Sequence, residues 1–216
     1  MNLPNKLTIL RIILVPIMVI VYYLGILGII NEEFLGVAIV NWIIMAIFGM
    51  ASYTDHLDGK IARKNNLITA FGKFADPLAD KILVLAAMLI LVEDGKLPAW
   101  IPIIVLFREF VVSGYRLIAV EKGGQVIAAN IWGKIKTVTQ MIAIILMFLS
   151  NFSYCQFIFR ASTLEEASAS SALWYMPTGE YILNILASVL MTVSVVATIF
   201  SGWSYLKNSK ELFKDC

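Results

Sequence analysis

The chain has 216 residues, of which 60% are hydrophobic and only 15% charged, and its net charge at pH 7 is +2. Soluble domains contain about 45–50% apolar and about 25% charged residues, so this composition excludes an ordinary soluble domain. So small a net charge gives no reason to expect a nucleic-acid partner. The cysteines, Cys155 and Cys216, lack a C-x-x-C spacing, and His56 is the single histidine, which makes a zinc site improbable. The sequence predicts an all-α integral membrane protein, because lipid must cover so apolar a surface.

Six stretches are long and apolar enough to cross a membrane as helices, which takes roughly 20 residues each. They lie near residues 8–30, 34–54, 77–92, 99–120, 131–150 and 181–206. The first runs to Ile30 without an A-x-A-like cleavage site, so we expect it to remain in the mature protein. The sequence therefore predicts six transmembrane helices in one membrane-embedded domain over residues 1–216, with an external loop at 151–180.

The lysines and arginines predict how this bundle is oriented. An even number of spans puts both termini on one side of the membrane. Fifteen Lys and Arg residues fall on that side or in helices opening towards it, and only Lys96 and Arg160 fall opposite. Cytoplasmic segments carry the excess of positive charge. We therefore expect both termini to be cytoplasmic and, since no targeting presequence is visible, a bacterial plasma-membrane location.

Four aspartates lie between the second and third spans, at Asp55, Asp58, Asp76 and Asp80. Positions 55, 58, 59 and 62 share one face if the second span continues as a helix, and positions 72, 76 and 80 form a stripe on the next helix. Carboxylates gathered at a membrane interface repel one another and need a cation. Oxygen ligands without cysteine or histidine suit Mg²⁺, Mn²⁺ or Ca²⁺, and four suffice for two ions about 4 Å apart. The pattern predicts a dinuclear metal site.

Small residues and an arginine accompany the aspartates. Gly59, Ala62 and Gly72 would leave room for close backbone approach or for a flat ligand. Arg63 adjoins them, and a guanidinium binds phosphate oxygens with forked geometry. Acidic metal ligands beside an arginine are what phosphoryl transfer requires. His56 falls roughly 100° off the metal face of its helix, so we interpret it as a bystander.

The complete pattern is Asp55-x-x-Asp58-Gly59-x-x-Ala62-Arg63, eight residues, then Gly72-x-x-x-Asp76-x-x-x-Asp80. It resembles the signature of the CDP-alcohol phosphatidyltransferase family at every fixed position. The chain is also similar to the branch that forms phosphatidylglycerophosphate in five segments: Asn2-Leu-Pro-Asn-Lys-Leu-Thr8-x-x-Arg11, Gly72-Lys-Phe-x-Asp-Pro-Leu-Ala-Asp-Lys81, Arg108-Glu-Phe, Gly114-x-Arg116 and Gly133-Lys-x-Lys136. This resemblance implies a six-helix membrane enzyme, usually a homodimer. Such an enzyme transfers the phosphatidyl group of CDP-diacylglycerol to sn-glycerol 3-phosphate and releases CMP.

The resemblance also implies roles for the signature residues. The four aspartates would bind two divalent ions, Mg²⁺ or Mn²⁺, that grip the CDP pyrophosphate. Asp80 would also serve as general base, taking the proton of the glycerol hydroxyl. The cytidine-diphosphate site would be lined by Gly59, Ala62, Arg63 and Gly72.

The second substrate, glycerol 3-phosphate, carries its own phosphate and needs its own cations. Charged groups in or near a bilayer are costly and usually face a cavity. The candidates for this acceptor site are Arg108, Arg116, Lys134 and Lys136, with Thr8 and Arg11 as further ones. The alternatives are an ion pair with Glu109 or snorkelling to the interface for Arg108, and a positive-inside anchoring role for the two lysines.

Two other functions remain open. The same chemistry would serve another alcohol, such as serine, inositol phosphate or phosphatidylglycerol. A divalent-cation transporter would also place aspartates in the membrane. The transporter is disfavoured because the carboxylates gather at one interface beside Arg63, and because no second acidic layer crosses the bilayer.

Overall fold

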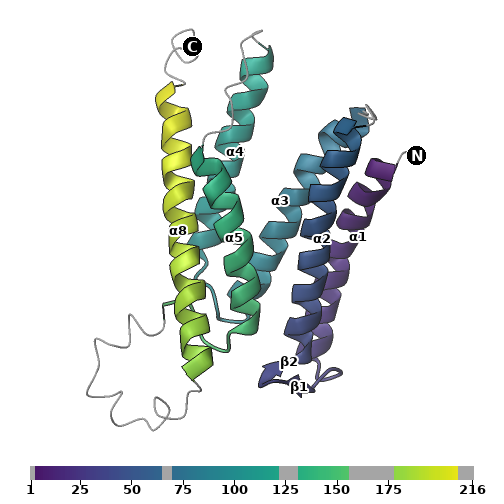
Figure 1. Ribbon diagram of the computed structural model, residues 1–216, viewed down its shortest axis with the longest axis vertical. Coiled ribbons are helices and arrows are strands. Elements are labelled where there is room, and N and C mark those ends of the chain that lie inside the picture. The colour runs from purple at the N-terminus through teal and green to yellow at the C-terminus, as the bar shows by residue number, and fades with distance from the viewer. Residues whose placement is uncertain (1–2, 65–69, 122–130, 156–177, 209–216) are drawn as a thin grey trace. The chain divides into compact units, whose positions relative to one another are not determined.

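The computed structural model describes residues 3–64, 70–121, 131–155 and 178–208 (Figure 1), and the side chains of 5–54, 75–115, 131–155, 182–205 and 207. Within these residues the chain forms six α-helices and one small sheet. The helices are α1 (Leu3–Ile26), α2 (Ile39–Lys64), α3 (Ala70–Glu93), α4 (Trp100–Glu121), α5 (Ile131–Leu149) and α8 (Thr178–Asn208).

Each predicted span corresponds to one of these helices. In the described part of the chain, three helices are long and apolar enough to cross a membrane, and α2 contributes a shorter apolar segment. The three long segments are Asn5–Ile26, Ile131–Leu149 and Ile182–Tyr205, and the shorter one is Ile39–Thr54. The helical class is therefore confirmed. The count of six spans and the side on which the termini lie stay predictions.

A short β-hairpin precedes α2. Its strands, β1 (Glu33–Phe34) and β2 (Val37–Ala38), pair antiparallel. Leu35 and Gly36 form the two-residue turn and have φ values of 55° and 74°, which is the backbone of a type I′ turn. The second span, predicted to begin at residue 34, is consequently helical only from Ile39.

The described residues group into two compact units. The first draws on Met1–Lys96 and Ile145–Ser153, and the second on Leu97–Ile144 and Tyr154–Cys216. In the first unit α1 packs against α2 and α3, and in the second α4 packs against α8. Fully buried side chains of the first unit include Met18, Ile44, Phe48, Leu83, Met88 and Leu91.

Helices α1 and α3 run parallel within the first unit. Thr8 of α1 donates a hydrogen bond to Asp76 of α3, and four turns later Tyr23 donates one to Glu93 at 3.0 Å. The two bonds join residues separated by 68 and 70 positions. One register therefore holds along roughly 22 Å of α1, at 1.5 Å per residue.

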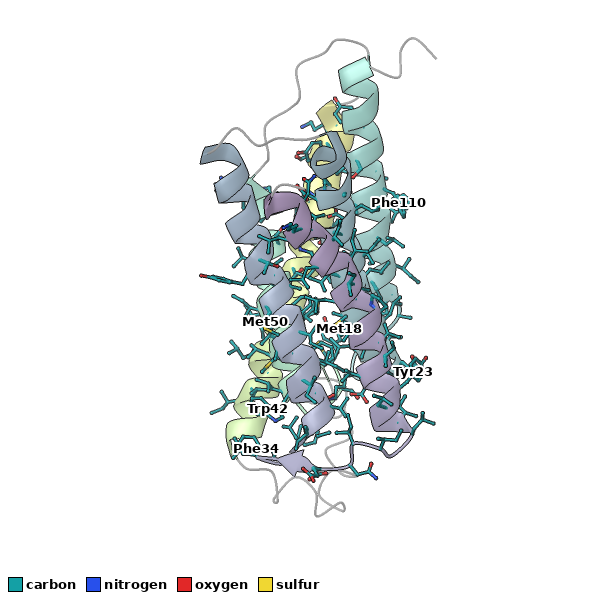
Figure 2. The ribbon with its side chains drawn as sticks, turned by 90° about the vertical axis from the view of Figure 1, so that its right-hand side faces the viewer. Met18, Tyr23, Phe34, Trp42, Met50 and Phe110 are labelled. Carbon is teal, nitrogen blue, oxygen red and sulfur yellow. The ribbon has the colours of Figure 1, made fainter. Side chains whose placement is uncertain are left out.

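The exterior of the helices is apolar and part of the interior is polar. Met50 and Phe110 point outwards while Met18 lies between helices (Figure 2). Buried polar side chains include Thr8, Arg11, Gln140, Asn184, Ser194, Thr198 and Ser201. Outward-facing apolar residues need lipid, and small polar residues let helices approach closely and hydrogen-bond across the contact. This distribution fits a membrane protein.

The hairpin is attached to α2 by aromatic contacts. Trp42 Nε1 donates a hydrogen bond to the Phe34 carbonyl oxygen at 3.1 Å. Their rings meet edge to face with centroids 5.8 Å apart (Figure 2). Because Trp combines an apolar ring with a polar N–H, it suits the boundary between an apolar helix and a polar turn.

Candidate active site

The aspartate signature occupies two consecutive helices of the first unit. Helix α2 continues unbroken to Lys64, which meets the condition set for the shared face, so positions 55, 58, 59, 62 and 63 lie on its last three turns. Helix α3 begins at Ala70 and carries positions 72, 76 and 80. The two helices pack together, so the end of α2 and the start of α3 meet at one end of the unit (Figure 1).

Six signature side chains lie outside the described ones: Asp55, Asp58, Gly59, Ala62, Arg63 and Gly72. Their helical backbone is described, but their contacts are not. The described side chains by themselves hold no group of three Asp, Glu, His or Cys residues suited to a metal ion. The dinuclear site therefore stays a prediction, which the backbone of α2 and α3 supports.

Asp76 and Asp80 are the signature aspartates whose side chains the structure describes. They stand one helical turn apart on α3, so they share a face, and both are half-buried. Thr8 is fully buried, and its hydroxyl donates a hydrogen bond to Oδ1 of Asp76. Carboxylate oxygens fixed by a neighbouring donor suit a hard divalent cation, because ligands are commonly oriented by such outer partners.

Arg11 follows Thr8 by one turn of α1 and is also fully buried. The parallel register of α1 and α3 places it at the level of Asp80. A buried guanidinium requires anionic or polar neighbours. The structure thus groups Thr8 and Arg11, both predicted for the acceptor site, with the aspartates of α3.

A second group of charged side chains lies in the second unit. Oε1 of Glu109 on α4 accepts hydrogen bonds from Arg108 Nη1 at 2.8 Å and from Lys136 Nζ of α5. Arg108 Nη2 donates to Ser201 Oγ of α8 at 2.5 Å. We call Arg108, Glu109, Lys136 and Ser201 the Glu109 cluster. It is mostly buried, with side-chain exposures of 7% for Lys136, 12% for Arg108 and 20% for Glu109.

The Glu109 cluster contains two of the predicted acceptor-site residues, Arg108 and Lys136. The ion pair between Arg108 and Glu109, raised above as an alternative, is present. Lys134 is exposed, because two residues along a helix correspond to about 200° of rotation and Lys136 faces inwards. The side chain of Arg116 lies outside the described ones.

Sequence reasoning missed the contribution of Ser201. Position 201 is 93 residues from Arg108, and nothing in the order of the residues connects them. Glu109 was considered only as a partner for its neighbour, although it also binds Lys136. The spacing of 27 residues between Glu109 and Lys136 carries no periodic signal, so only the packing of α4, α5 and α8 reveals the cluster.

These features define a helical membrane-type protein with carboxylates at one end of two adjacent helices. Comparison with known proteins identifies the family of this protein. The family model of CDP-alcohol phosphatidyltransferase matches residues 1–200. A Bacillus subtilis protein named CDP-diacylglycerol–glycerol-3-phosphate 3-phosphatidyltransferase is 41% identical over 99% of this chain and 97% of its own. A Rickettsia felis protein of the same name is 32% identical over 98% and 97%.

A Mycobacterium tuberculosis protein named probable phosphatidylglycerophosphate synthase is 38% identical over 95% of this chain and 80% of its own. The chain belongs to the CDP-alcohol phosphatidyltransferase family. It is therefore an enzyme, a phosphatidyltransferase of a family that generally uses divalent metal ions. The oxygen-only set formed by its signature aspartates fits such ions.

Proposed function

We propose that this chain transfers the phosphatidyl group of CDP-diacylglycerol to sn-glycerol 3-phosphate, forming phosphatidylglycerophosphate and CMP in phospholipid biosynthesis. The observation that carries the proposal is the complete signature on two packed helices, α2 and α3. The names of relatives that match at least 95% of the chain support this donor and this acceptor.

The donor would bind at the signature. Two divalent ions, Mg²⁺ or Mn²⁺, would be held by Asp55, Asp58, Asp76 and Asp80. When bound, these ions would offset the charge of the pyrophosphate and of the departing CMP. The Thr8 hydroxyl supports this arrangement because it fixes the carboxylate of Asp76. The cytidine diphosphate would contact Gly59, Ala62, Arg63 and Gly72, where small residues leave room and the guanidinium meets phosphate oxygens.

Asp80 would act as the general base. The glycerol hydroxyl oxygen forms a bond to the phosphorus that carries the lipid, while Asp80 takes the hydroxyl proton. The bond between that phosphorus and the bridging pyrophosphate oxygen breaks, and CMP leaves with the oxygen. One phosphorus–oxygen bond is formed and one is broken, so the exchange requires no oxidant or reductant.

The phosphate of the acceptor would bind to cations of its own. Arg108 and Lys136 support this role because the Glu109 cluster brings them together in a mostly buried place. A charged hydrogen-bond donor in such a place binds a phosphate oxygen more strongly than one in water. The further predicted contributors are Arg116, Lys134 and Arg11, whereas Thr8 donates a hydrogen bond to Asp76 and is assigned to the aspartate end.

We also propose six membrane spans, with both termini and the active site on the cytoplasmic side of a bacterial plasma membrane, and a homodimer. The distribution of Lys and Arg supports the orientation. A variant with Cys155 and Cys216 replaced by serine would carry one new cysteine, Lys6→Cys or Asp94→Cys. A membrane-impermeant maleimide applied to whole cells should label position 94 and leave position 6 unlabelled. The opposite result would invert the topology.

The reaction is tested with purified protein in detergent micelles containing CDP-diacylglycerol and one alcohol at a time. We expect CMP release with glycerol 3-phosphate, together with phosphatidylglycerophosphate as the lipid product identified by mass. Faster release with serine, inositol phosphate or phosphatidylglycerol would replace the acceptor. Divalent-cation flux in proteoliposomes without any CMP release would favour the transporter instead.

A further inference from the structure

The proposed function assigns no role to Glu109, the acidic residue of the Glu109 cluster. Oε1 of Glu109 accepts hydrogen bonds from both Arg108 and Lys136. These two cations come from different helices, α4 and α5. One carboxylate oxygen therefore fixes the positions of two charged groups that the sequence separates by almost thirty residues.

The charge balance of the cluster requires Glu109. A guanidinium and an ammonium that both bond to one oxygen lie close together, and their repulsion is strong where water is largely excluded. Glu109 offsets one of the two positive charges. The cluster keeps one net positive charge, so it remains able to attract an anion.

Arg108 is held from several sides. Ser201 Oγ accepts a hydrogen bond from Nη2. A Cβ atom added at Gly133 would lie 3.5 Å from Nη2, and one added at Gly202 would lie 3.5 Å from Cγ of Arg108. The arginine therefore passes near both glycines, Gly133 on α5 and Gly202 on α8, and its hydrogen bonds to Glu109 and Ser201 hold the guanidinium.

Arg108 nevertheless has one further hydrogen-bond donor, its Nε–H. Its Nε is buried and makes no hydrogen bond with any residue that the structure describes. A buried polar group without a partner is costly and calls for an explanation such as a ligand. A phosphate oxygen would accept a hydrogen bond from this N–H, and the net positive charge would attract the phosphate and partly offset its negative charge, whereas an uncharged alcohol group would gain nothing from that charge.

We propose that Glu109 is a positioning residue for the phosphate of the acceptor substrate. It holds the Arg108 guanidinium and the Lys136 ammonium together at a fixed place and leaves a single net positive charge for a phosphate monoester. This inference rests on the proposed function, in which Arg108 and Lys136 bind glycerol 3-phosphate. Glu109 itself does not touch the substrate.

The experiment compares Glu109→Gln with wild-type enzyme in the CMP-release assay. Glutamine keeps the size of the side chain but removes the charge that holds the two cations. The KM for glycerol 3-phosphate should rise about 10-fold or more, as for the loss of a charge-assisted contact. The KM for CDP-diacylglycerol should stay within about twofold, and kcat should change less than the acceptor KM.

The control Glu93→Gln makes the same substitution in the first unit, where Tyr23 is the partner, and should leave all three constants unchanged.

A double variant separates positioning from general structural support. Because Glu109 acts through Lys136 as well as Arg108, Glu109→Gln combined with Lys136→Gln should raise the acceptor KM by clearly less than the product of the two single effects. Fully multiplicative effects of the two substitutions would overturn the inference. An equal rise in both KM values for Glu109→Gln would also overturn it, because a loosened fold affects both substrates.

Failure of the inference differs from failure of the proposed function. If the wild type uses glycerol 3-phosphate and Arg108→Gln raises its KM while Glu109→Gln does not, only the role of Glu109 is wrong. If the wild type releases no CMP with glycerol 3-phosphate, the proposed function itself is wrong. Should Glu109→Gln not fold, Glu109→Asp takes its place. That side chain keeps the charge but is one methylene shorter, so the same selective rise is expected, and its absence counts against the inference.

Discussion

The aspartate end of α2 and α3 offers carboxylates to a ligand, whereas the Glu109 cluster offers cations. In both regions one group of opposite charge and one hydroxyl accompany them. At the aspartate end, the four carboxylates of the signature are carried by two helices, and one fully buried arginine, Arg11, lies at the level of Asp80. In the cluster, two cations predominate and one carboxylate joins them. A hydroxyl assists in each: Thr8 donates to Asp76, and Ser201 accepts from Arg108. In the proposed function, the carboxylates of the first region would bind metal cations and the cations of the second would bind an anionic phosphate.

Removing divalent metal should have the largest effect, because all four aspartates of the proposed site would lose their ions. This change acts on the aspartate end and not on the Glu109 cluster. An excess of chelator should abolish CMP release and also weaken binding of CDP-diacylglycerol, since the carboxylates would then repel the pyrophosphate. Adding Mg²⁺ or Mn²⁺ beyond the chelator should restore both. A chelator already saturated with Mg²⁺ is the control. Full turnover in excess chelator would contradict a metal site.

Asp80→Asn should have the next largest effect. The substitution removes the proposed base and one carboxylate of the metal set, so turnover should fall by roughly 10²- to 10⁴-fold. Three aspartates remain, and substantial binding of CDP-diacylglycerol should persist, measured by equilibrium binding in micelles. The control Asp94→Asn changes a carboxylate that pairs with Lys96 at 3.0 Å and should keep normal turnover. Near-normal turnover in Asp80→Asn would place the base elsewhere.

Arg108→Gln should affect the acceptor rather than the donor. Loss of a charge-assisted contact costs about 1.5–3 kcal/mol, which corresponds to roughly a 10- to 150-fold rise in the KM for glycerol 3-phosphate. The KM for CDP-diacylglycerol is the internal control and should change little. An equal change in both would mean that the cluster serves the fold or the donor, and the comparison between the two regions would fail.

Much of the fold could be predicted because apolar length determines where helices cross a membrane. The residues at which the helices begin were harder to predict from the sequence. The second span begins later than expected because Leu35 and Gly36 form a tight turn without the usual Asn-Gly sequence. Helix α3 begins at Ala70, before the apolar stretch that starts near residue 77, since an apolar window omits the polar turns that carry the signature. The spacing of positions 72, 76 and 80 predicts these turns instead.

The two regions differ in how far sequence reveals them. The signature lies within 26 consecutive positions, and helical spacing alone predicts that its members share faces. The Glu109 cluster draws on three helices, and Ser201 enters only through tertiary packing. Adjacent residues on a helix diverge by about 100°, which by itself disfavours a pair between Arg108 and Glu109. The long arginine side chain reaches back despite this angle.

Thr8→Val should have a moderate effect confined to the aspartate end. Valine keeps the shape of the side chain but cannot donate a hydrogen bond to Asp76. Loss of an outer partner of a metal ligand lowers metal affinity by about 10-fold or more, so the metal concentration for half-maximal activity should rise by that factor. The acceptor KM measured at saturating metal should not change. The control Thr139→Val removes a hydroxyl that bonds only within its own helix, at 2.8 Å to the Ile135 carbonyl. A rise in the acceptor KM instead would mean that Thr8 belongs to the acceptor site.

Lys134→Ala should have the smallest effect and tests where the acceptor site ends. Lys134 and Lys136 are two positions apart on α5, yet Lys134 is exposed and Lys136 buried beside Glu109. Water and salt screen an exposed charge, so its loss should raise the acceptor KM by less than about fivefold. Lys136→Gln, which removes the buried charge, should raise it more. Equal effects of the two substitutions would mean that the acceptor phosphate also reaches the exposed face of α5. The boundary of the acceptor site would then include Lys134, and burial would no longer distinguish the two lysines.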